Sequence, residues 1–375
     1  MHLAFHDRAR ERETATSRYL AGGHMRRALI TGSSGLIGSE AVTTFDNRGW
    51  EVHGVDNNMR REFFGADGDT LWNLARLRRV TARFTHHDFD IRDQSRMDDL
   101  VKALRPQLIF HCAAQPSHDL AKARPLEDFD INARATLGLL EAARRHCPEA
   151  PFVFMSSNKV YGDAPNELPL QERATRWDYA RKEDYEGVDE SCRIDASTHS
   201  LFGASKLAAD LLVQEYGRYF GMPTVCFRGG CLTGSSHAGA ELHGFLAYLA
   251  RCIREGRTYR LYGYKGKQVR DNIHAADVCA AALAFFEQPR AGAVYNLGGG
   301  RANSLSMLEA IDAFESRMGK KLSWRYEEQP RVGDHICYIS NLTRFRRDYP
   351  AWSLTRSLSS ILDELARDVH ATPSS

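Results

Sequence analysis

The stretch Leu29–Gly38, LITGSSGLIG, joins a short apolar run to an amphipathic one. Three glycines at this spacing between a strand and a helix are typical of a loop that binds a dinucleotide. Gly32 allows the tight turn, Gly35 lets the backbone approach a pyrophosphate, and Gly38 lets the helix pack closely against the sheet. The stretch therefore predicts a strand, a phosphate-binding loop and a helix in that order.

A second apolar run, WEVHGVD, follows the helix and ends in Asp56. A carboxylate at this place can accept both ribose hydroxyls of NAD, and it would repel the 2′-phosphate of NADP. Arg60 and Arg61 follow closely and could hold that phosphate, so NADP stays open as an alternative. We predict NAD as the cofactor.

The same alternation of strand-like and helix-like runs continues from Arg26 onward and predicts βαβ units in a parallel, doubly wound α/β sheet. After about residue 231 the alternation ends and shorter segments of mixed pattern follow, with helical patterns at 242–255 and 304–318. We expect a Rossmann domain of residues 25–230 plus 270–290. Residues 231–269 plus 291–370 are assigned to a smaller, mixed α/β substrate domain. The chemistry is expected in the cleft between the two.

Composition excludes several classes of protein. The 375 residues are 43% hydrophobic and 26% charged, which excludes a disordered chain. Lys plus Arg at 50 against Asp plus Glu at 48 leaves a net charge of +2 without a basic block, so we expect no nucleic-acid partner. No apolar run approaches the roughly 18 residues of a membrane span.

The eight cysteines are scattered without CxxC or His-rich spacing. This pattern predicts neither a metal site nor a disulfide framework, and a reduced cytoplasm is the expected location. Residues 1–24 mix both charge signs and lack an apolar core, so they are not a secretory signal. We interpret them as a disordered N-terminal extension, an added leader or a misassigned start.

Several further segments resemble the extended short-chain dehydrogenase/reductase superfamily, whose members act on nucleotide sugars. Asp88–Ile91 looks like the segment beside the adenine, His111–Ala114 like the turn over the phosphates, and Asn132 like the family's asparagine at a helix start. The resemblance implies a set of cofactor-binding residues: Gly32, Ser34, Gly35, Leu36, Ile37, Gly38, Asp56, Asn57, Asp90, Ile91, Ala113, Ala114, Gln115, Asn132 and Lys206.

The string FMSSNKVYG, residues 154–162, corresponds in that family to the catalytic serine or threonine segment. By its distance from Val-Tyr-Gly, Ser157 is the hydroxyl that would bond the sugar oxygen. In the 4,6-dehydratases of the family an acidic pair follows, whereas this chain has Asn158 and Lys159. Dehydration is therefore disfavoured, because the acid that would eliminate water is missing.

The family's Tyr-x-x-x-Lys motif is altered here. Phe202 stands where the tyrosine, the usual general base, is expected, while Lys206 is retained and can reach the ribose hydroxyls. Either Phe202 is native and another group takes the proton, or a tyrosine hydroxyl has been removed by substitution. The candidate replacements are Lys159, His199, Cys231, Tyr161 and, more remotely, His118.

Within the superfamily the chain most resembles the CDP-tyvelose (CDP-paratose) 2-epimerases. The resemblance rests mainly on the strings SNKVYGD (157–163), GKQVRD (266–271) and HAAD (274–277). It implies transient oxidation at C2 of a nucleoside-diphosphate hexose, with Arg270 and Arg331 as clamps on the diphosphate. The implied substrate-binding residues are Ser157, Asn158, Lys159, His199, Arg270 and Arg331, and the implied catalytic set is Ser157, Lys206, Phe202, Lys159 and Asn158.

The sequence leaves several alternative functions open. The same scaffold supports epimerisation at C4 or C3 and net oxidation, and the missing tyrosine is also consistent with a sensor or with an interaction protein that kept only the fold. The aromatic loop 57–72 either covers the site or packs into the core. A homodimer is expected through apolar helices near 129–144 and 201–219, as is common in the family.

Overall fold

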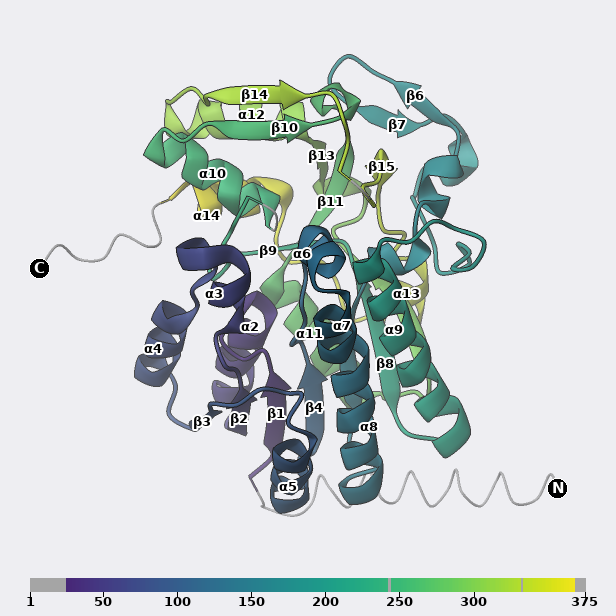
Figure 1. The fold of residues 1–375 in the computed structure, drawn as a ribbon. Coiled ribbons are helices and arrows are strands. Elements are labelled where there is room, and N and C mark those ends of the chain that lie inside the picture. The colour runs from purple at the N-terminus through teal and green to yellow at the C-terminus, as the bar shows by residue number, and fades with distance from the viewer. Residues whose placement is uncertain (1–24, 242–243, 332, 368–375) are drawn as a thin grey trace, which may run out of the picture.

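A parallel seven-stranded sheet forms the larger part of the molecule (Figure 1), in the order β12-β8-β5-β4-β1-β2-β3. The computed structural model describes residues 25–241, 244–331 and 333–367, so the expected extension 1–24 lies outside the described residues. The strands are β1 (Arg27–Thr31), β2 (Glu51–Val55), β3 (Phe84–His87), β4 (Leu108–His111), β5 (Phe152–Ser157), β8 (Thr224–Gly229) and β12 (Ala293–Leu297). The strand order grows outward from β1 and β4 in both directions, which confirms the predicted doubly wound fold.

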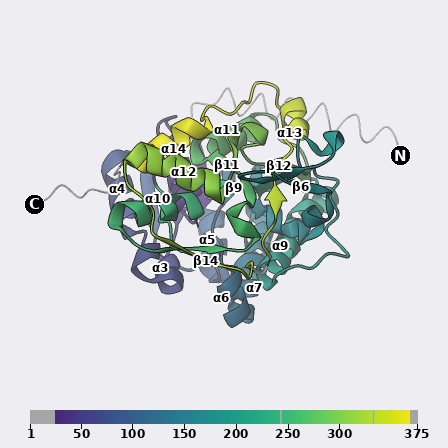
Figure 2. The same ribbon diagram turned by 90° about the horizontal axis from the view of Figure 1, so that it is seen from above.

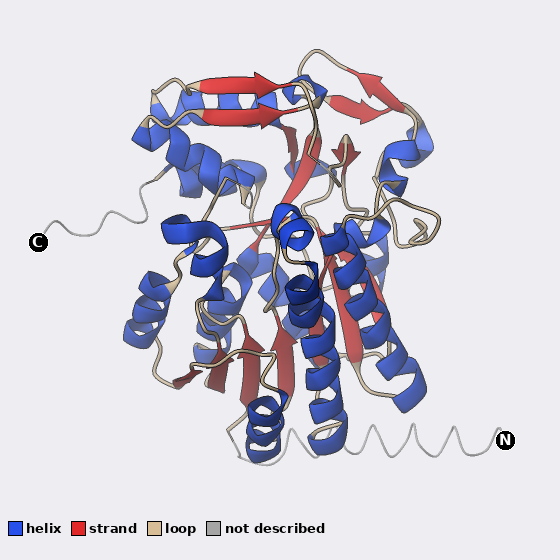
Figure 3. Cartoon of the chain, in the orientation of Figure 1, coloured by secondary structure: helices blue, strands red, loops and turns tan. Residues whose placement is uncertain are grey.

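Helices cover both faces of this sheet (Figure 3). One face carries α2 (Leu36–Asp46) and α11 (Ala275–Glu287). The other carries α5 (Gln94–Leu104), α8 (Ala135–His146) and α9 (Leu201–Phe220). Shorter helices lie between strands: α3 (Met59–Phe64), α4 (Leu71–Val80), α6 (His118–Ala123) and α7 (Pro125–Phe129). No helix in the described ranges has both the length and the apolarity needed to cross a bilayer.

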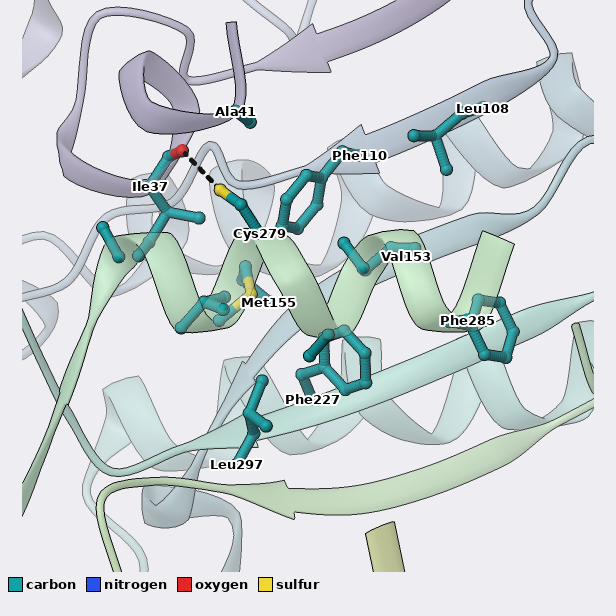
Figure 4. Close-up of a cluster of buried hydrophobic side chains, with 14 of the residues drawn as sticks. Ile37, Ala41, Leu108, Phe110, Val153, Met155, Phe227, Cys279, Phe285 and Leu297 are labelled. Atoms are coloured by element: carbon teal, nitrogen blue, oxygen red, sulfur yellow. Dashed lines mark hydrogen bonds between the residues drawn. The ribbon is translucent and has the colours of Figure 1, made fainter. Parts of the chain in front are cut away.

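The alternation of strand side chains builds the two cores. In β1, Ala28 and Ile30 face α2 and α11, whereas Leu29 faces the opposite layer. Figure 4 shows Phe110, Val153 and Phe227, from three neighbouring strands, pointing toward α11. Because every one of these side chains is withdrawn from water, hydrophobic burial fixes the register of the strands.

A second core lies in the smaller part of the molecule, where α10 (Phe245–Glu255), α12 (Met307–Met318) and α14 (Leu358–Ala366) pack on one another (Figure 2). Its strands are β10 (Tyr259–Tyr262) and β14 (Trp324–Glu327). Connecting strands are β9 (Cys231–Thr233), β11 (Val269–His274), β13 (Ser304–Ser306) and β15 (Cys337–Tyr338), and β6 (Leu170–Glu172) pairs with β7 (Trp177–Tyr179). The part of the chain after residue 231 thus contains the expected shorter, mixed elements.

The assignment of residues 291–370 to the smaller domain is wrong for part of that range. The strand β12 pairs in parallel with β8 as the outer strand of the large sheet. Phe345, in α13 (Thr343–Asp348), and Trp352 pack in the same core as α2 and α11. The physical reason is that these apolar side chains cover an edge of the sheet that would otherwise face water.

A buried ion pair joins three elements beneath the site. The Arg228 guanidinium donates to both carboxylate oxygens of Asp210, at 2.8 and 3.2 Å, and to the Tyr161 hydroxyl at 3.1 Å. The Tyr161 hydroxyl donates in turn to Asn296 at 2.7 Å. Arg228 and Asp210 are 4% and 0% exposed in their side chains, so each charge depends on the other for its stabilisation.

We predict that Arg228→Leu lowers the free energy of unfolding by about 3–5 kcal/mol, because it leaves the Asp210 carboxylate buried without its counter-charge. Urea denaturation measures this loss. The matched control is Arg193→Leu, which breaks the exposed pair with Glu167 and should cost at most about 1 kcal/mol. Equal losses in the two variants would contradict the prediction.

Candidate functional site

The glycine loop after β1 brings three backbone segments into close contact. Gly32 has a φ of 68°, and a Cβ there would lie 2.8 Å from the Ala113 nitrogen in the turn after β4. A Cβ on Gly38 would lie 2.0 Å from the Gly32 carbonyl oxygen. Gly35 differs, because its Cβ would meet only the Gly32 carbonyl, at 3.3 Å, and the residue lines a cavity. The loop is thus packed tightly toward the protein and left open toward a ligand.

This cavity has a volume of about 460 Å³ and lies at the ends of the parallel strands, beneath the smaller part of the molecule. Most of the predicted site residues line it: Gly32, Gly35, Leu36, Ile37, Gly38, Asp56, Asn57, Asp90, Ile91, Ala113, Ala114, Ser157, Asn158, Lys159, Phe202, Lys206, Arg270 and Arg331. Ser34, Gln115, Asn132 and His199 do not appear in its lining.

Asp56 is held by the glycine loop itself. One carboxylate oxygen accepts the Ser34 N–H at 2.9 Å, and the other accepts the Asn58 N–H at 2.8 Å. Burial raises the pKa of this carboxyl, and the two backbone donors act in the opposite direction. Ser34 therefore contributes its backbone N–H. This bond helps to orient the two Asp56 carboxylate oxygens, as acceptors, at the strand end where ribose hydroxyls would lie.

Asp90 and the two arginines after Asp56 have definite partners. The Asp90 carboxylate accepts two hydrogen bonds from the Arg92 guanidinium, at 3.0 and 2.7 Å, one from the Arg92 backbone N–H at 2.8 Å, and one from Asn57 at 3.1 Å. Arg61 pairs with Asp69 at 3.2 Å. Arg60 donates to the Ala238 carbonyl at 2.6 Å and its guanidinium lies 4.7 Å from the Phe64 ring centre. These contacts direct Arg61 toward α4 and Arg60 toward the smaller domain.

Gln115 and Asn132 form a buried network behind the cavity wall. The Asn132 side-chain amide donates to the Gln115 carbonyl at 3.0 Å and to the Ser205 hydroxyl at 3.1 Å. The Gln115 N–H donates back to Asn132 at 3.0 Å. These bonds tie the turn after β4 to α9, so the two residues position the cavity wall rather than form it.

Ser157 ends β5 and lines the cavity. Its hydroxyl oxygen accepts the Lys159 N–H at 3.2 Å, so the hydroxyl hydrogen remains for another acceptor. Lys206 lies nearby, with Nζ donating to the Met155 carbonyl at 2.7 Å and placed 4.1 Å from the Phe154 ring centre. Burial lowers the pKa of Lys206 to about 8.

Phe202 is 7% exposed and presents a ring without a hydroxyl to the cavity. The His118 ring packs edge-on against it, with centroids 5.0 Å apart, and His118 Nδ1 lies 2.7 Å from the Ser200 hydroxyl. Burial lowers the pKa of His118 to about 3, so this ring is neutral. The contact explains how Phe202 is accommodated, but it supplies no group at the place of a tyrosine hydroxyl.

Two of the five candidate replacements for the tyrosine are used structurally. The Tyr161 hydroxyl lies in the network of Arg228, and both ring nitrogens of His199 lie against backbone carbonyls, at 3.0 Å from Ser197 and 2.8 Å from Val160. His199, which we expected at the substrate, does not line the cavity, and its ring contacts the backbone of Val160, after Ser157, and of Ser197, before α9. Lys159, Cys231 and His118 line the cavity.

These three side chains differ in pKa, and therefore in how readily each can exchange a proton near neutral pH. Burial raises the pKa of the Cys231 thiol to about 12, which disfavours the thiolate. Burial also lowers the pKa of Lys159 to about 8, although the neighbouring Asp334 carboxylate acts in the opposite direction. Lys159 is thus the candidate whose proton affinity lies nearest to neutral pH.

Two arginines enter the cavity from the side of the smaller domain. Arg270 in β11 is buried and pairs with Asp334, which also faces Lys159 Nζ at 3.8 Å. Arg331 donates to Asp119 at 3.1 Å and lines the same region. Because the positive side chains gather at one end of a partly buried space, this end is suited to a group with adjacent negative charges.

The aromatic segment 57–72 forms α3 and the short helix after it. Phe63 and Arg60 line the cavity, whereas Trp72 is 37% exposed. Sequence reasoning did not select Tyr259, Tyr262 and Gln268, which line the far end in the smaller domain. Gln268 stands within the quoted string GKQVRD, so the string already contained a signal for it.

Residues 28–298 match the NAD dependent epimerase/dehydratase family. The chain is 32% identical to CDP-paratose 2-epimerase of Salmonella typhi, over 85% of this chain and 92% of that protein. It is 28% identical to UDP-glucose 4-epimerase of Yersinia pestis, over 91% and 95% of the two chains.

A solved structure is also similar. The UDP-glucose 4-epimerase of Thermus thermophilus, in complex with NAD, is 26% identical and superposes with a TM-score of 0.71. The match covers 91% of this chain and 97% of that one. The likeness therefore includes the large sheet and the smaller part above it.

We predict losses of stability of different size for two substitutions in the glycine loop. Gly38→Ala should destabilise the protein by about 1–3 kcal/mol, because its Cβ overlaps the Gly32 carbonyl. Gly35→Ala should cost less than Gly38→Ala, because its Cβ would meet only the Gly32 carbonyl oxygen, at 3.3 Å, and a small shift of the loop relieves that contact. Thermal unfolding measures both, and a larger loss in the Gly35 variant would contradict the packing described.

Proposed function

The chain belongs to the NAD dependent epimerase/dehydratase family, and on this basis we propose that it binds NAD and epimerises a nucleoside-diphosphate hexose, at C2 of a CDP-sugar. The observation that carries the proposal is one continuous cavity, which extends from the glycine loop past Ser157 to Arg270 and Arg331. It offers a loop suited to a dinucleotide on one side of the Ser157 hydroxyl and two arginines suited to a diphosphate on the other.

The residues present fit NAD. The loop is open toward the cavity at Gly35, and the Asp56 carboxylate stands at the strand end with both oxygens oriented by backbone N–H groups. When bound, NAD supplies an acceptor for a sugar hydride that is later returned to the other face of the carbon. Because the hydride is returned, the cofactor would not be consumed in a turnover.

The chain's own residues bind and orient the sugar. The Ser157 hydroxyl, whose oxygen is already bound by the Lys159 N–H, donates its hydrogen to the oxygen of the carbon that reacts. Arg270 and Arg331 hold the diphosphate. Asn158 and Lys159 replace an acidic pair, which is why the proposal is epimerisation and not dehydration.

C2 and the CDP group are supported by the resemblance to CDP-paratose 2-epimerase and by the strings SNKVYGD and GKQVRD. The alternatives are epimerisation at C4 or C3 and net oxidation, which use the same Ser157 and Lys206. Phe202 specifically favours one further candidate, a sensor that binds NAD and a nucleotide sugar without turnover, because the usual proton acceptor is absent.

We also propose a homodimer in a reduced, cytoplasmic compartment. Leu126, Phe129, Leu137 and Leu211 are exposed apolar side chains on α7, α8 and α9. A second copy of these helices would cover them in a four-helix arrangement. The eight free thiols, all in the described ranges, suit the reducing compartment.

We predict that the protein with NAD inverts C2 of a CDP-hexose and leaves the sugars of UDP, GDP, ADP and dTDP unchanged. Proton NMR of the ring couplings over time identifies the carbon that inverts. Inversion at C4 or C3 would contradict the proposed reaction at C2. If both ligands bind and no sugar reacts until Phe202→Tyr is introduced, the sensor is the correct function.

We predict that Asp56→Ala weakens NAD binding by about 10- to 100-fold, the range expected for lost hydrogen bonds to a charged acceptor. NADP binding should not fall, because the repulsive carboxylate is gone. Calorimetric titration measures both affinities, with Asp99→Ala on α5 as control. An unchanged NAD affinity would place the ribose elsewhere.

A further inference from the structure

Lys159 Nζ contacts two acceptors, a histidine ring nitrogen and a backbone carbonyl oxygen. The buried His335 places Nε2 2.8 Å from the Gly162 carbonyl, and a carbonyl can only accept, so Nε2 carries the hydrogen. Burial lowers the pKa of His335 well below its ordinary value, so the ring is neutral and Nδ1 is an acceptor. His335 Nδ1 lies 3.5 Å from Lys159 Nζ. The second acceptor is the Gly333 carbonyl, 2.9 Å from the same nitrogen.

This arrangement suits a neutral amine as well as an ammonium group. A neutral lysine nitrogen has two N–H donors and one lone pair, and the two acceptors account for both donors. Neither acceptor engages the lone pair of Nζ. The Lys159 side chain is 16% exposed and lines the same cavity as Ser157, so a ligand in this cavity has access to the amine.

We propose that Lys159 replaces the missing tyrosine as the acid/base group of the reaction, with His335 as its positioning residue. The proposal rests on the proposed function. During oxidation the sugar O–H bond breaks and its proton passes to Lys159 Nζ. NAD, when bound, would accept the hydride from the same carbon, which would leave a carbonyl on the sugar. In the return step Nζ gives the proton back to that oxygen.

The charges around Lys159 support a group that titrates near neutral pH. Burial lowers its pKa to about 8, Arg270 and Arg331 act in the same direction, and Asp334 and Cys231 oppose them. His118 also faces Lys159 and is neutral. Because the base must be deprotonated to accept a proton, kcat/KM, which reports the protein before substrate binds, falls as the pH drops below about 8 and levels off above it.

The other cavity-lining side chains serve this role less well. The Cys231 thiol keeps its proton to a pKa of about 12, and the neutral His118 has a pKa of about 3, which makes it a weak base. Lys206 shares the lowered pKa, but its ammonium is bound to the Met155 carbonyl and lies over the Phe154 ring. Lys159 alone among these four follows Ser157 on the same turn.

The first test is Lys159→Arg, which keeps the positive charge but cannot lose a proton at neutral pH. We expect kcat for sugar epimerisation to fall by about 10²- to 10⁴-fold with little change in KM. Adding Phe202→Tyr to this variant should restore much of the rate, because it returns the hydroxyl that the cavity lacks. Lys102→Arg, on the exposed face of α5, is the matched control.

His335 is tested by the pH profile. His335→Phe keeps a ring beside Tyr338, 5.1 Å away between centroids, but removes one of the two acceptors of the Lys159 ammonium. The protonated form is then less stable, so the acid limb of kcat/KM should move to lower pH. An unchanged limb would remove His335 from the proposal.

A second readout needs no sugar. Acetic anhydride labelling of the NAD-loaded protein between about pH 6 and 10, followed by mass spectrometry of the Lys159 peptide, gives the pKa of this amine. We expect half-maximal labelling of Lys159 near pH 8. Labelling of Lys159 that is still rising at the upper end of this pH range would overturn the proposal.

The two proposals fail in different ways. If the unaltered protein epimerises a sugar and Lys159→Arg retains at least a tenth of the rate, the role of Lys159 is refuted and the proposed function stands. If the unaltered protein is inert to every sugar while Lys159 titrates near pH 8, the proposed function is refuted, and Lys159 as an acid/base group of that reaction falls with it.

Discussion

The contact between the turn after β1 and the first turn of α2 determines where every other group of the site lies. The Gly32 carbonyl lies so close to Gly38 that no Cβ fits between them, and the same turn touches the backbone of Ala113 after β4. This packing brings β1, α2 and β4 together at the point where the strand order reverses. Parallel sheets place their ligand sites at such a point, and here the cavity begins there.

Buried charge is the second constraint. Arg270, Asp334 and Lys159 form one cluster at the cavity end nearest the smaller domain, and Arg331 lies beside it. The Asp334 carboxylate carries one charge and faces two cations, Arg270 and Lys159, so the space favours a ligand that carries negative charge. A bound diphosphate would raise the pKa of Lys159 toward its ordinary value, which couples substrate binding to the protonation state of the amine.

Local patterns in the sequence were sufficient for the sheet, the glycine loop and Asp56, because these depend on neighbouring residues. They were not sufficient where distant segments meet. His118 packs on Phe202, and His335 binds Lys159, across separations in sequence that no periodic pattern reports. The strand β12 was assigned to the wrong domain for the same reason, since its pairing with β8 is a long-range contact.

The returned hydride is the feature that distinguishes this chemistry from proton abstraction at carbon. The most direct measurement is the fate of deuterium in a CDP-hexose labelled at C2, followed by proton NMR and mass spectrometry as the sugar epimerises in ordinary water. We expect the product to keep its deuterium at C2, with no net reduction of NAD. Loss of the deuterium to solvent, or its accumulation in reduced cofactor, would contradict an epimerase that returns the hydride it takes.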